Sequence, residues 1–385
     1  MTFNKISTRV EISLDNLLHN LNQIRSLSPG AGVLAVIKDC AYGCGSVMIA
    51  RTLEQQGGVN FFAVARPEEA FKLRESGLKS PILVLGEAST EQIKAAFTRE
   101  ILFSCNSLET LYDWIASGLQ VRFHCHIDTG MNRMGILPSE TEMLAKIFLD
   151  NAGDKLFLEG IYTHLACADE PGTTTVDDQL TKFRQSISIL RSHGLSPNHV
   201  HFANSATAMR FELGECTHMR PGIALYGCKP DPAQDFTLDL RPVASLKSFV
   251  TKIKKVPAGS PVSYGWNYVT SSETWIATIA AGYAQGVPRF LSNKGSVLIR
   301  GKKYRIAGNV TMDYIMVDAG PEPEISVGDE VVIMGSQSDK CITPDEVAAI
   351  GNTISYEVLC HLSTAIDRLY LLNDSIVLHS AGNIF

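Results

Sequence analysis

The sequence lacks the long apolar runs of a membrane protein. Nowhere in its 385 residues does an apolar stretch approach the roughly 18 residues that a spanning helix needs, and its first residues contain no apolar signal core. An excess of basic residues is also missing, since the formal net charge is -6. We therefore expect no membrane span and no nucleic-acid partner.

A disulfide framework is absent too. The nine cysteines are scattered, without a Cys-x-x-Cys pair or regular spacing. An odd number of unpatterned cysteines in a chain without a signal core predicts reduced thiols and a cytoplasmic location. The ordinary share of apolar residues, 45%, predicts a globular protein with a sizeable core.

The most informative stretch is the apolar run Val33 to Ile37, which leads directly into Lys38. A short continuous apolar run predicts a strand buried on both faces, and Ala41-Tyr42-Gly43 then breaks the chain into a loop. A lysine at the end of such a strand either extends its amine into solvent or is partly desolvated and nucleophilic, as in Schiff-base chemistry with pyridoxal phosphate (PLP).

Short apolar runs then alternate with helical patterns. With the strand that ends in Lys38, seven β-α units follow one another at regular spacing, and an eighth strand is available at Thr217 to Arg220 or at Ile223 to Tyr226. Eight such units predict a (β/α)8 TIM barrel of the α/β class. The alternative is an open doubly wound sheet, but the glycine-rich turn typical of its first strand is absent.

The sequence pattern changes after about residue 238. Short strand patterns replace the helical ones, among them Val243 to Val256, Tyr304 to Val310 and Tyr314 to Val317. We therefore predict two domains, a barrel over residues 1–238 and a mostly β C-terminal domain over 239–385. The strand at Thr8 to Ser13 belongs either to the barrel domain or to the C-terminal domain.

Polar side chains recur where the barrel strands are expected to end. Catalytic groups of such barrels come from the C-terminal ends of several strands, and their phosphate sites commonly use the last two strand-end loops. Ser205, Gly222 and Ile223 are suitably placed for a phosphate. The strand-end side chains are Lys38, Asp128, Arg133, His164, Asn204, Ser205 and Arg220.

These residues lie in motifs that resemble those of the PLP-dependent alanine racemases, which are barrel proteins with a C-terminal β domain. The resemblance extends from about Arg9 to about Tyr370. The matching motifs are Ala35–Lys38, Ala41–Gly43, Ile127–Gly135, Tyr162–Ala166, Ala168–Glu170, Asn204–Ala206, Arg220–Gly227, Val262–Gly265, Gly282–Ala284, Met312–Asp313 and Tyr356–Cys360.

The resemblance implies a two-base racemase of alanine that supplies D-alanine for peptidoglycan. Lys38 would carry PLP and act as one base, and Tyr264 of the partner subunit in a homodimer would be the other. Substrate-binding residues would be Arg133, Tyr283, Met312 and Asp313. The other cofactor-binding residues would be Tyr42, Arg133, His164, Asn204, Ser205, Arg220, Gly222, Ile223 and Tyr356.

The implied roles agree with the chemistry of a racemase. Bases on opposite faces let a proton leave one side of the α-carbon and return on the other. A phenol needs nearby cations to act as a base, and Arg133 and His164 would supply them. Arg220 would face the ring nitrogen of the cofactor and keep it unprotonated, which disfavours transamination.

Two positions depart from the family pattern. Cys44 stands where members usually carry histidine, and His126 stands where many carry a carbamylated lysine that orients the arginine. Arg133 would therefore be held by a bound anion or in another way. His124-Cys125-His126 also resembles a metal motif, but strand alternation places the imidazoles and the thiol on opposite faces. We predict barrel packing there and no metal.

Three alternatives remain. The first is a racemase of broader specificity that also accepts serine. The second is a barrel-type PLP decarboxylase, whose second domain normally carries a cysteine and aspartate motif that we do not find. The third is a PLP-carrier protein without catalysis, against which the second domain and Tyr264 argue.

Overall fold

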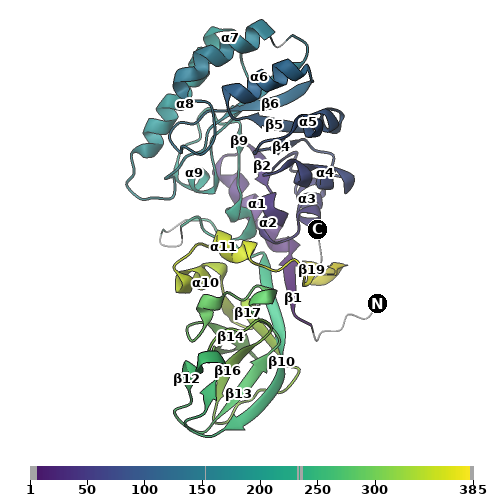
Figure 1. Ribbon diagram of the computed structural model, residues 1–385. Coiled ribbons are helices and arrows are strands. Elements are labelled where there is room, and N and C mark those ends of the chain that lie inside the picture. Colours follow the sequence, from purple (N-terminus) through teal and green to yellow (C-terminus); the bar gives the residue numbers. More distant parts are fainter. Residues whose placement is uncertain (1–6, 152, 232–233, 235–236, 382–385) are drawn as a thin grey trace.

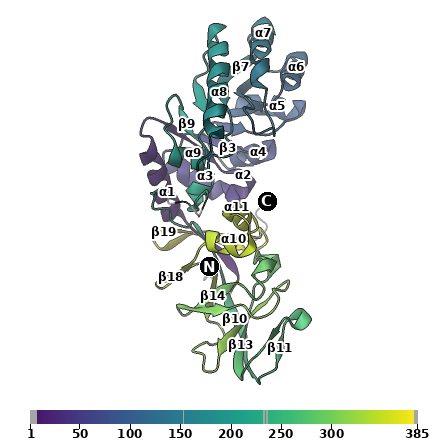
Figure 2. The ribbon, with the colours of Figure 1, turned by 90° about the vertical axis from the view of Figure 1, so that its left-hand side faces the viewer.

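The molecule is elongated, with a barrel at one end and a β domain at the other (Figure 1 and Figure 2). The computed structural model describes residues 7–151, 153–231, 234 and 237–381. The outermost residues of the two expected domains, 1–6 and 382–385, lie outside this range. None of the helices in the described part combines the length and the apolar character needed to cross a membrane.

The eight barrel strands pair in parallel in the order β8-β7-β6-β5-β4-β3-β2-β9. The barrel closes because the Thr217 N–H donates to the Val200 carbonyl at 2.7 Å. The predicted barrel is confirmed. The strands are β2 (Gly32–Val36), β3 (Phe61–Val64), β4 (Ile82–Val84), β5 (Ile101–Cys105), β6 (Val121–His126), β7 (Leu156–Tyr162), β8 (His199–His201) and β9 (His218–Met219).

The eighth strand, β9, is the first of the two candidates. The second candidate, Ile223 to Tyr226, is a 3-10 helix (η3) that ends at Gly227 in the left-handed region. Gly227 is required there, since a Cβ would lie 1.9 Å from the Arg241 carbonyl oxygen.

Helices cover the outside of the barrel. Their apolar faces pack inward, as in α8, where Val176, Leu180 and Phe183 are buried. The helices are α1 (Leu14–Leu27), α3 (Ser46–Gln55), α4 (Pro67–Glu75), α5 (Thr90–Ala96), α6 (Leu108–Ser117), α7 (Thr141–Asn151), α8 (Thr175–Ser192) and α9 (Ser205–Arg210).

The C-terminal domain is built on a ten-stranded sheet, which confirms the mostly β prediction. Two short helices, α10 (Pro344–Gly351) and α11 (Ser355–Cys360), lie between this sheet and the barrel (Figure 2). The strands are β10 (Ala244–Val256), β13 (Thr274–Ile279), β14 (Ser296–Ile299), β15 (Lys302–Arg305), β16 (Ile315–Gly320), β17 (Glu330–Gln337), β18 (Lys340–Ile342), β19 (Asp367–Leu372) and β20 (Ser375–Ser380), with a separate pair β11 (Pro261–Val262) and β12 (Tyr268–Val269).

The tenth strand of the sheet comes from the N-terminus. Strand β1 (Arg9–Ser13) pairs antiparallel with β10 and parallel with β19, so the first element of the chain lies in the second domain's sheet (Figure 1). Helix α1 follows β1 directly, with Ser13 accepting a hydrogen bond from the Asn16 N–H as N-cap. The chain thus enters the barrel from the β domain.

One predicted strand is wrong in its bounds. The expected strand Tyr304 to Val310 begins earlier, as β15, and ends at Arg305. Beyond it, only a single bridge joins Ile306 to Val317. The chain turns away because Gly308 has a φ of +83° and donates its N–H to the Asn293 side chain at 2.6 Å, so the pairing cannot continue.

Candidate active site

A cavity of about 710 Å³ opens at the C-terminal ends of the barrel strands. Its size suits a small-molecule ligand, and its position is that of the active sites of TIM barrels. The cavity brings together every cofactor-binding residue that the resemblance implied: Lys38, Tyr42, Arg133, His164, Asn204, Ser205, Arg220, Gly222, Ile223 and Tyr356.

Lys38 begins a left-handed turn rather than ending a strand. Strand β2 stops at Val36, and α2 (Lys38–Tyr42) contains Asp39 and the three residues after it with φ between 52° and 57°. Left-handed backbone costs about 1–2 kcal/mol per residue without glycine. This turn orients both Lys38 and Tyr42 toward the cavity, and strain of this kind is concentrated at functional sites.

Contacts from both domains hold the strained turn. Glu69 of α4 accepts hydrogen bonds from the Asp39 N–H at 2.5 Å and the Ala65 N–H at 2.9 Å. From the C-terminal domain, the buried guanidinium of Arg368 donates to the Gly43 carbonyl at 2.8 Å and 3.0 Å. The turn is therefore clamped between the barrel and the sheet.

A narrow polar cradle lies beside the turn. The hydroxyl of Ser205 accepts from the Gly222 N–H at 3.1 Å, and a Cβ on Gly222 would lie 2.4 Å from the Tyr42 hydroxyl oxygen. Asn204 caps α9 by accepting from the Thr207 N–H at 2.9 Å. This cradle of hydroxyls and backbone amides, in which a side chain at residue 222 would crowd the Tyr42 hydroxyl, fits the phosphate of PLP.

Arg220 is a buried cation surrounded by neutral acceptors. Its guanidinium donates to the His201 carbonyl at 2.7 Å, the Thr163 carbonyl at 2.8 Å and the Nδ1 atoms of His201 and His164 at 3.1 and 3.2 Å. It also lies 5.4 Å from the centre of the Tyr162 ring. Burial lowers the pKa of Arg220 to about 10, so the side chain stays charged at neutral pH.

His164 is neutral. Burial, followed by the positive charges of Arg220 and Arg133, holds its pKa well below the ordinary value. Its Nδ1 can then accept the hydrogen bond from Arg220. Arg220 is a charged donor and His164 beside it is neutral, so this part of the cavity suits a ring nitrogen that carries no proton and can accept a hydrogen bond, as in PLP.

Arg133 stands on the loop after β6. The carboxylate of Asp128 holds the loop by accepting from the backbone N–H groups of Gly130, Met131 and Asn132 at 3.0, 2.9 and 3.1 Å. Within the described chain the guanidinium of Arg133 has no ion-pair partner. It is therefore available to an anionic group in the cavity.

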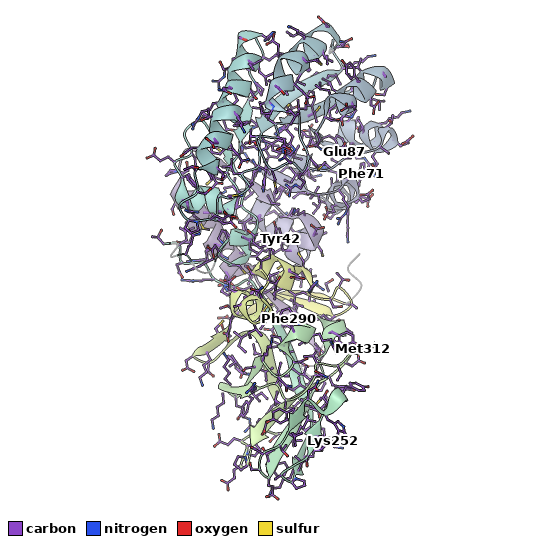
Figure 3. The ribbon with its side chains drawn as sticks, turned by 60° about the vertical axis from the view of Figure 1, so that its left-hand side comes forward. Tyr42, Phe71, Glu87, Lys252, Phe290 and Met312 are labelled. Atoms are coloured by element: carbon purple, nitrogen blue, oxygen red, sulfur yellow. The ribbon has the colours of Figure 1, made fainter. Side chains whose placement is uncertain are left out.

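Tyr264, Tyr283, Met312 and Asp313 do not reach the cavity of their own chain. All four side chains are exposed on the β domain, Tyr264 to 76%. Figure 3 shows Met312 on the surface of that domain, away from Tyr42, which lies at the end of the barrel nearest the domain. Within one chain, the structure thus brings the cofactor residues together and leaves the second base and the substrate residues apart.

The comparisons with known proteins cover both domains. Residues 12–230 match the model of the alanine racemase N-terminal domain and residues 243–370 that of its C-terminal domain. This chain belongs to the alanine racemase family. The alanine racemase of Desulforamulus reducens is 40% identical over 94% of this chain and 98% of its own, and that of Halothermothrix orenii is 38% identical over 94% and 96%.

Solved alanine racemases share the fold. The enzyme from Bacillus anthracis, crystallised with bound L-Ala-P, superposes with a TM-score of 0.91 at 35% identity and covers 99% of both chains. The enzyme from Streptomyces lavendulae has a TM-score of 0.90 at 34% identity and covers 96% of this chain and 98% of its own.

His126, the departure from the family pattern, is a neutral side chain in the cavity wall of this racemase-family barrel. Its Nδ1 lies 3.0 Å from the side-chain amide oxygen of Asn106, which can only accept, so Nδ1 carries the proton. Its ring stacks on Tyr162 at 4.3 Å. Burial, reinforced by Arg220, lowers its pKa to about 3. His126 therefore offers Arg133 a neutral surface and no negative charge.

Sequence reasoning missed Gln179, which joins two strand-end loops. Its amide donates to the Thr129 hydroxyl and the His164 carbonyl, both at 3.1 Å, and accepts from the Ala166 N–H at 2.9 Å. The available signal was a polar residue on the apolar face of α8, where it is 4% exposed. Glu69 was missed for a similar reason, since its partners are backbone groups of another element.

The cradle yields a first prediction. Gly222→Ala places a methyl group against the Tyr42 hydroxyl, so one side of the phosphate site must move. Losing a hydrogen bond to a charged group weakens binding about 10- to 100-fold, and we expect a loss of this size in PLP affinity. The measurement is a titration of apoprotein with PLP by absorbance.

Gly30→Ala is the matched control, because a Cβ at Gly30 would meet nothing within 4 Å. Its affinity should equal that of the unaltered protein. An unchanged affinity in Gly222→Ala would show that the phosphate does not bind at this cradle.

Proposed function

We propose that this enzyme interconverts L- and D-alanine with PLP held in the barrel cavity. The observation that carries the proposal is the convergence of ten implied cofactor residues on one cavity, in a chain that matches the family in both domains. Bound PLP would supply an electron sink that makes the Cα–H bond of the amino acid acidic.

Each part of the cofactor finds a suitable group. Lys38 would hold it covalently, and the cradle of Tyr42, Ser205 and Gly222, with Ile223 and Tyr356, would hold its phosphate. Arg220 would meet the ring nitrogen. Its Nε–H donates to no acceptor in the described chain, and as a permanent donor it favours a nitrogen that keeps its lone pair. An unprotonated ring limits transamination.

The proton would move between two bases. Lys38 would take it from the D-enantiomer and Tyr264 from the L-enantiomer, on the opposite face of the α-carbon. We assign Tyr264 to the partner subunit. Its backbone is fixed by the Asn309 amide at 2.7 Å in a turn where Ser263 and Trp266 have φ of 67° and 53°, although the phenol itself is exposed.

A homodimer is supported by the apolar surface around Tyr264. Trp266, Tyr314 and Met312 are exposed to 73%, 46% and 54% on the same domain, and a shallow hollow of about 500 Å³ joins Tyr264, Trp266 and Tyr314. Clusters of exposed apolar side chains mark protein interfaces. A second copy would cover them and bring Tyr264, Tyr283, Met312 and Asp313 to the cavity.

Alanine is the substrate that the family favours, and serine is the secondary candidate. The product, D-alanine, would serve peptidoglycan synthesis. We assign the enzyme to the cytoplasm, a choice supported by nine cysteines that are all free. Neither the decarboxylase nor the non-catalytic carrier is favoured by the family match.

The direct test is an enantiomer assay across L-amino acids with the purified holoenzyme. We expect L-alanine to be converted fastest to its enantiomer, and no conversion by Lys38→Ala. Borohydride reduction and peptide mapping should place the cofactor on Lys38. Label on another lysine, or carbon dioxide release in place of racemisation, would reject the assignment.

The shared site predicts subunit complementation. Chains carrying Lys38→Ala or Tyr264→Phe should each be inactive alone. After random exchange, half of the dimers hold one chain of each kind and one intact site of two, so about a quarter of the sites should recover. Mass spectrometry verifies the exchange. No recovery in exchanged dimers would mean that each site is built from one chain.

The two-base mechanism predicts one-sided exchange. Tyr264→Phe removes only the phenol oxygen, and racemisation should fall on the order of 10²- to 10⁴-fold. In D₂O this variant should still exchange the α-hydrogen of D-alanine faster than that of L-alanine, since Lys38 remains. NMR follows the deuterium. Equal exchange into both enantiomers would point to a single base.

A further inference from the structure

Four imidazoles fill the barrel interior beneath the cavity. His124 of β6, His199 and His201 of β8 and His218 of β9 pack around one another, with ring centres 5.4 Å apart for His124 and His199 and 5.0 Å apart for His124 and His201. Barrel interiors are usually filled by branched aliphatic side chains. Packing alone therefore does not explain why imidazole rings occupy these positions.

The neighbouring strands are shaped to admit the rings. A Cβ on Gly160 of β7 would lie 2.6 Å from the His124 ring, and a Cβ on Gly32 of β2 would lie 2.7 Å from the His218 ring. Such distances leave no room for another side chain. Gly160 lies in the interior of β7, where a glycine weakens the strand, whereas Gly32 is the first residue of β2. Each glycine makes space for one of the imidazoles.

The hydrogen bonds of this cluster lead to Arg220. His201 Nδ1 lies 3.1 Å from an Arg220 Nη atom, and His201 Nε2 lies 2.7 Å from His124 Nδ1. Arginine can only donate, so His201 Nδ1 must accept. Burial, with the neighbouring His124 and Arg220, holds the pKa of His201 well below its ordinary value, so the ring has one proton, on Nε2.

The proton position of His201 determines that of His124. Its Nδ1 must accept the proton of His201 Nε2, and burial with neighbouring His199 and His218 keeps this ring neutral as well. The single proton of His124 is therefore on Nε2, which is buried without a hydrogen-bond partner in the described chain. An unpaired buried donor is costly, and an apolar side chain at this position would have avoided that cost.

We propose that His201 and His124 are positioning residues for Arg220, joined in a one-directional hydrogen-bond chain that keeps the lone pair of His201 Nδ1 directed at the guanidinium. His124 fixes the tautomer of His201, and His201 orients Arg220. The His201 ring then holds an Nη atom of the guanidinium from the barrel interior, while the free Nε–H of Arg220 faces the cavity. The inference rests on the proposed function, in which Arg220 meets the ring nitrogen of PLP.

Two amide substitutions separate the ends of the His201 ring. In His201→Asn the side-chain oxygen can stand near the Nδ1 position and still accept from Arg220. In His201→Gln the amide reaches the Nε2 position, so Arg220 loses the side-chain acceptor of residue 201 and keeps its backbone carbonyl. The two variants have nearly the same polarity, so a difference between them reports the hydrogen bond to Arg220 rather than a loss of packing.

The functional readout is the partition between racemisation and transamination. In transamination the substrate amino group ends on the cofactor, giving pyruvate and pyridoxamine phosphate, and a misplaced Arg220 should favour it. We expect His201→Gln to raise the ratio of transamination to racemisation at least about tenfold, and His201→Asn to stay within about threefold. His124→Leu, which removes the acceptor for His201 Nε2, should change the ratio in the direction of His201→Gln.

His199→Gln is the control within the cluster. It removes a ring that stacks on His124 but takes no part in the hydrogen bonds to Arg220, so the partition should be unchanged. Circular dichroism and thermal unfolding verify the fold of each variant. Equal ratios in His201→Gln and His201→Asn, with both folded, would overturn the proposal.

NMR of the ¹⁵N-histidine-labelled protein supplies a test that needs no activity. His201 and His124 should both appear as neutral rings protonated on Nε2, with assignments from the signals that His201→Asn and His124→Leu remove. A proton on Nδ1 of His201 would overturn the chain of hydrogen bonds. If the unaltered enzyme failed to racemise alanine while the tautomers were as expected, the proposed function would fail but the chain would stand.

Discussion

The left-handed turn from Asp39 to Tyr42 is the constraint on which the site depends. Four consecutive residues without glycine are held in a conformation that L-amino acids avoid, and such a turn persists only where its surroundings over-determine it. Glu69 fixes it from the barrel and Arg368 from the β domain. The two domains therefore cooperate in placing Lys38 and Tyr42, and the site is a product of their packing.

Charge distribution follows from the same architecture. The cavity contains Lys38, Arg133 and Arg220, and the acceptors around Arg220 are carbonyl groups and imidazoles without negative charge. Burial keeps the neighbouring histidines neutral. A carboxylate partner would have neutralised Arg220, whereas neutral acceptors leave a positive potential available to an anionic cofactor and substrate.

The sequence pattern was sufficient to predict the barrel and the strand-end residues of the cavity, whereas Tyr42 and Tyr356 followed from the family resemblance. Apolar runs repeated at regular spacing, and parallel strands bring their C-terminal ends to one rim, so residues as distant as Lys38 and Arg220 were expected together. Partners that act through the backbone were not predictable. Glu69, Gln179 and Arg368 bind amides and carbonyls of remote elements, and no residue pairing in the sequence signals such contacts. The early end of β15 depended on the single turn at Gly308.

The four histidines inside the barrel, His124, His199, His201 and His218, show how core residues can support a site that they do not line. His124 was expected to pack inside the barrel, but the sequence could not distinguish a packed ring from one with a defined tautomer. That distinction arises from one atom, because Arg220 can only donate and so determines which nitrogen of His201 accepts. The requirement continues to His124 through a 2.7 Å contact. The donor-only guanidinium of Arg220 thus determines which nitrogen carries the proton in His201 and then in His124. Aliphatic side chains at these two positions would have no such preference, because they form no hydrogen bonds.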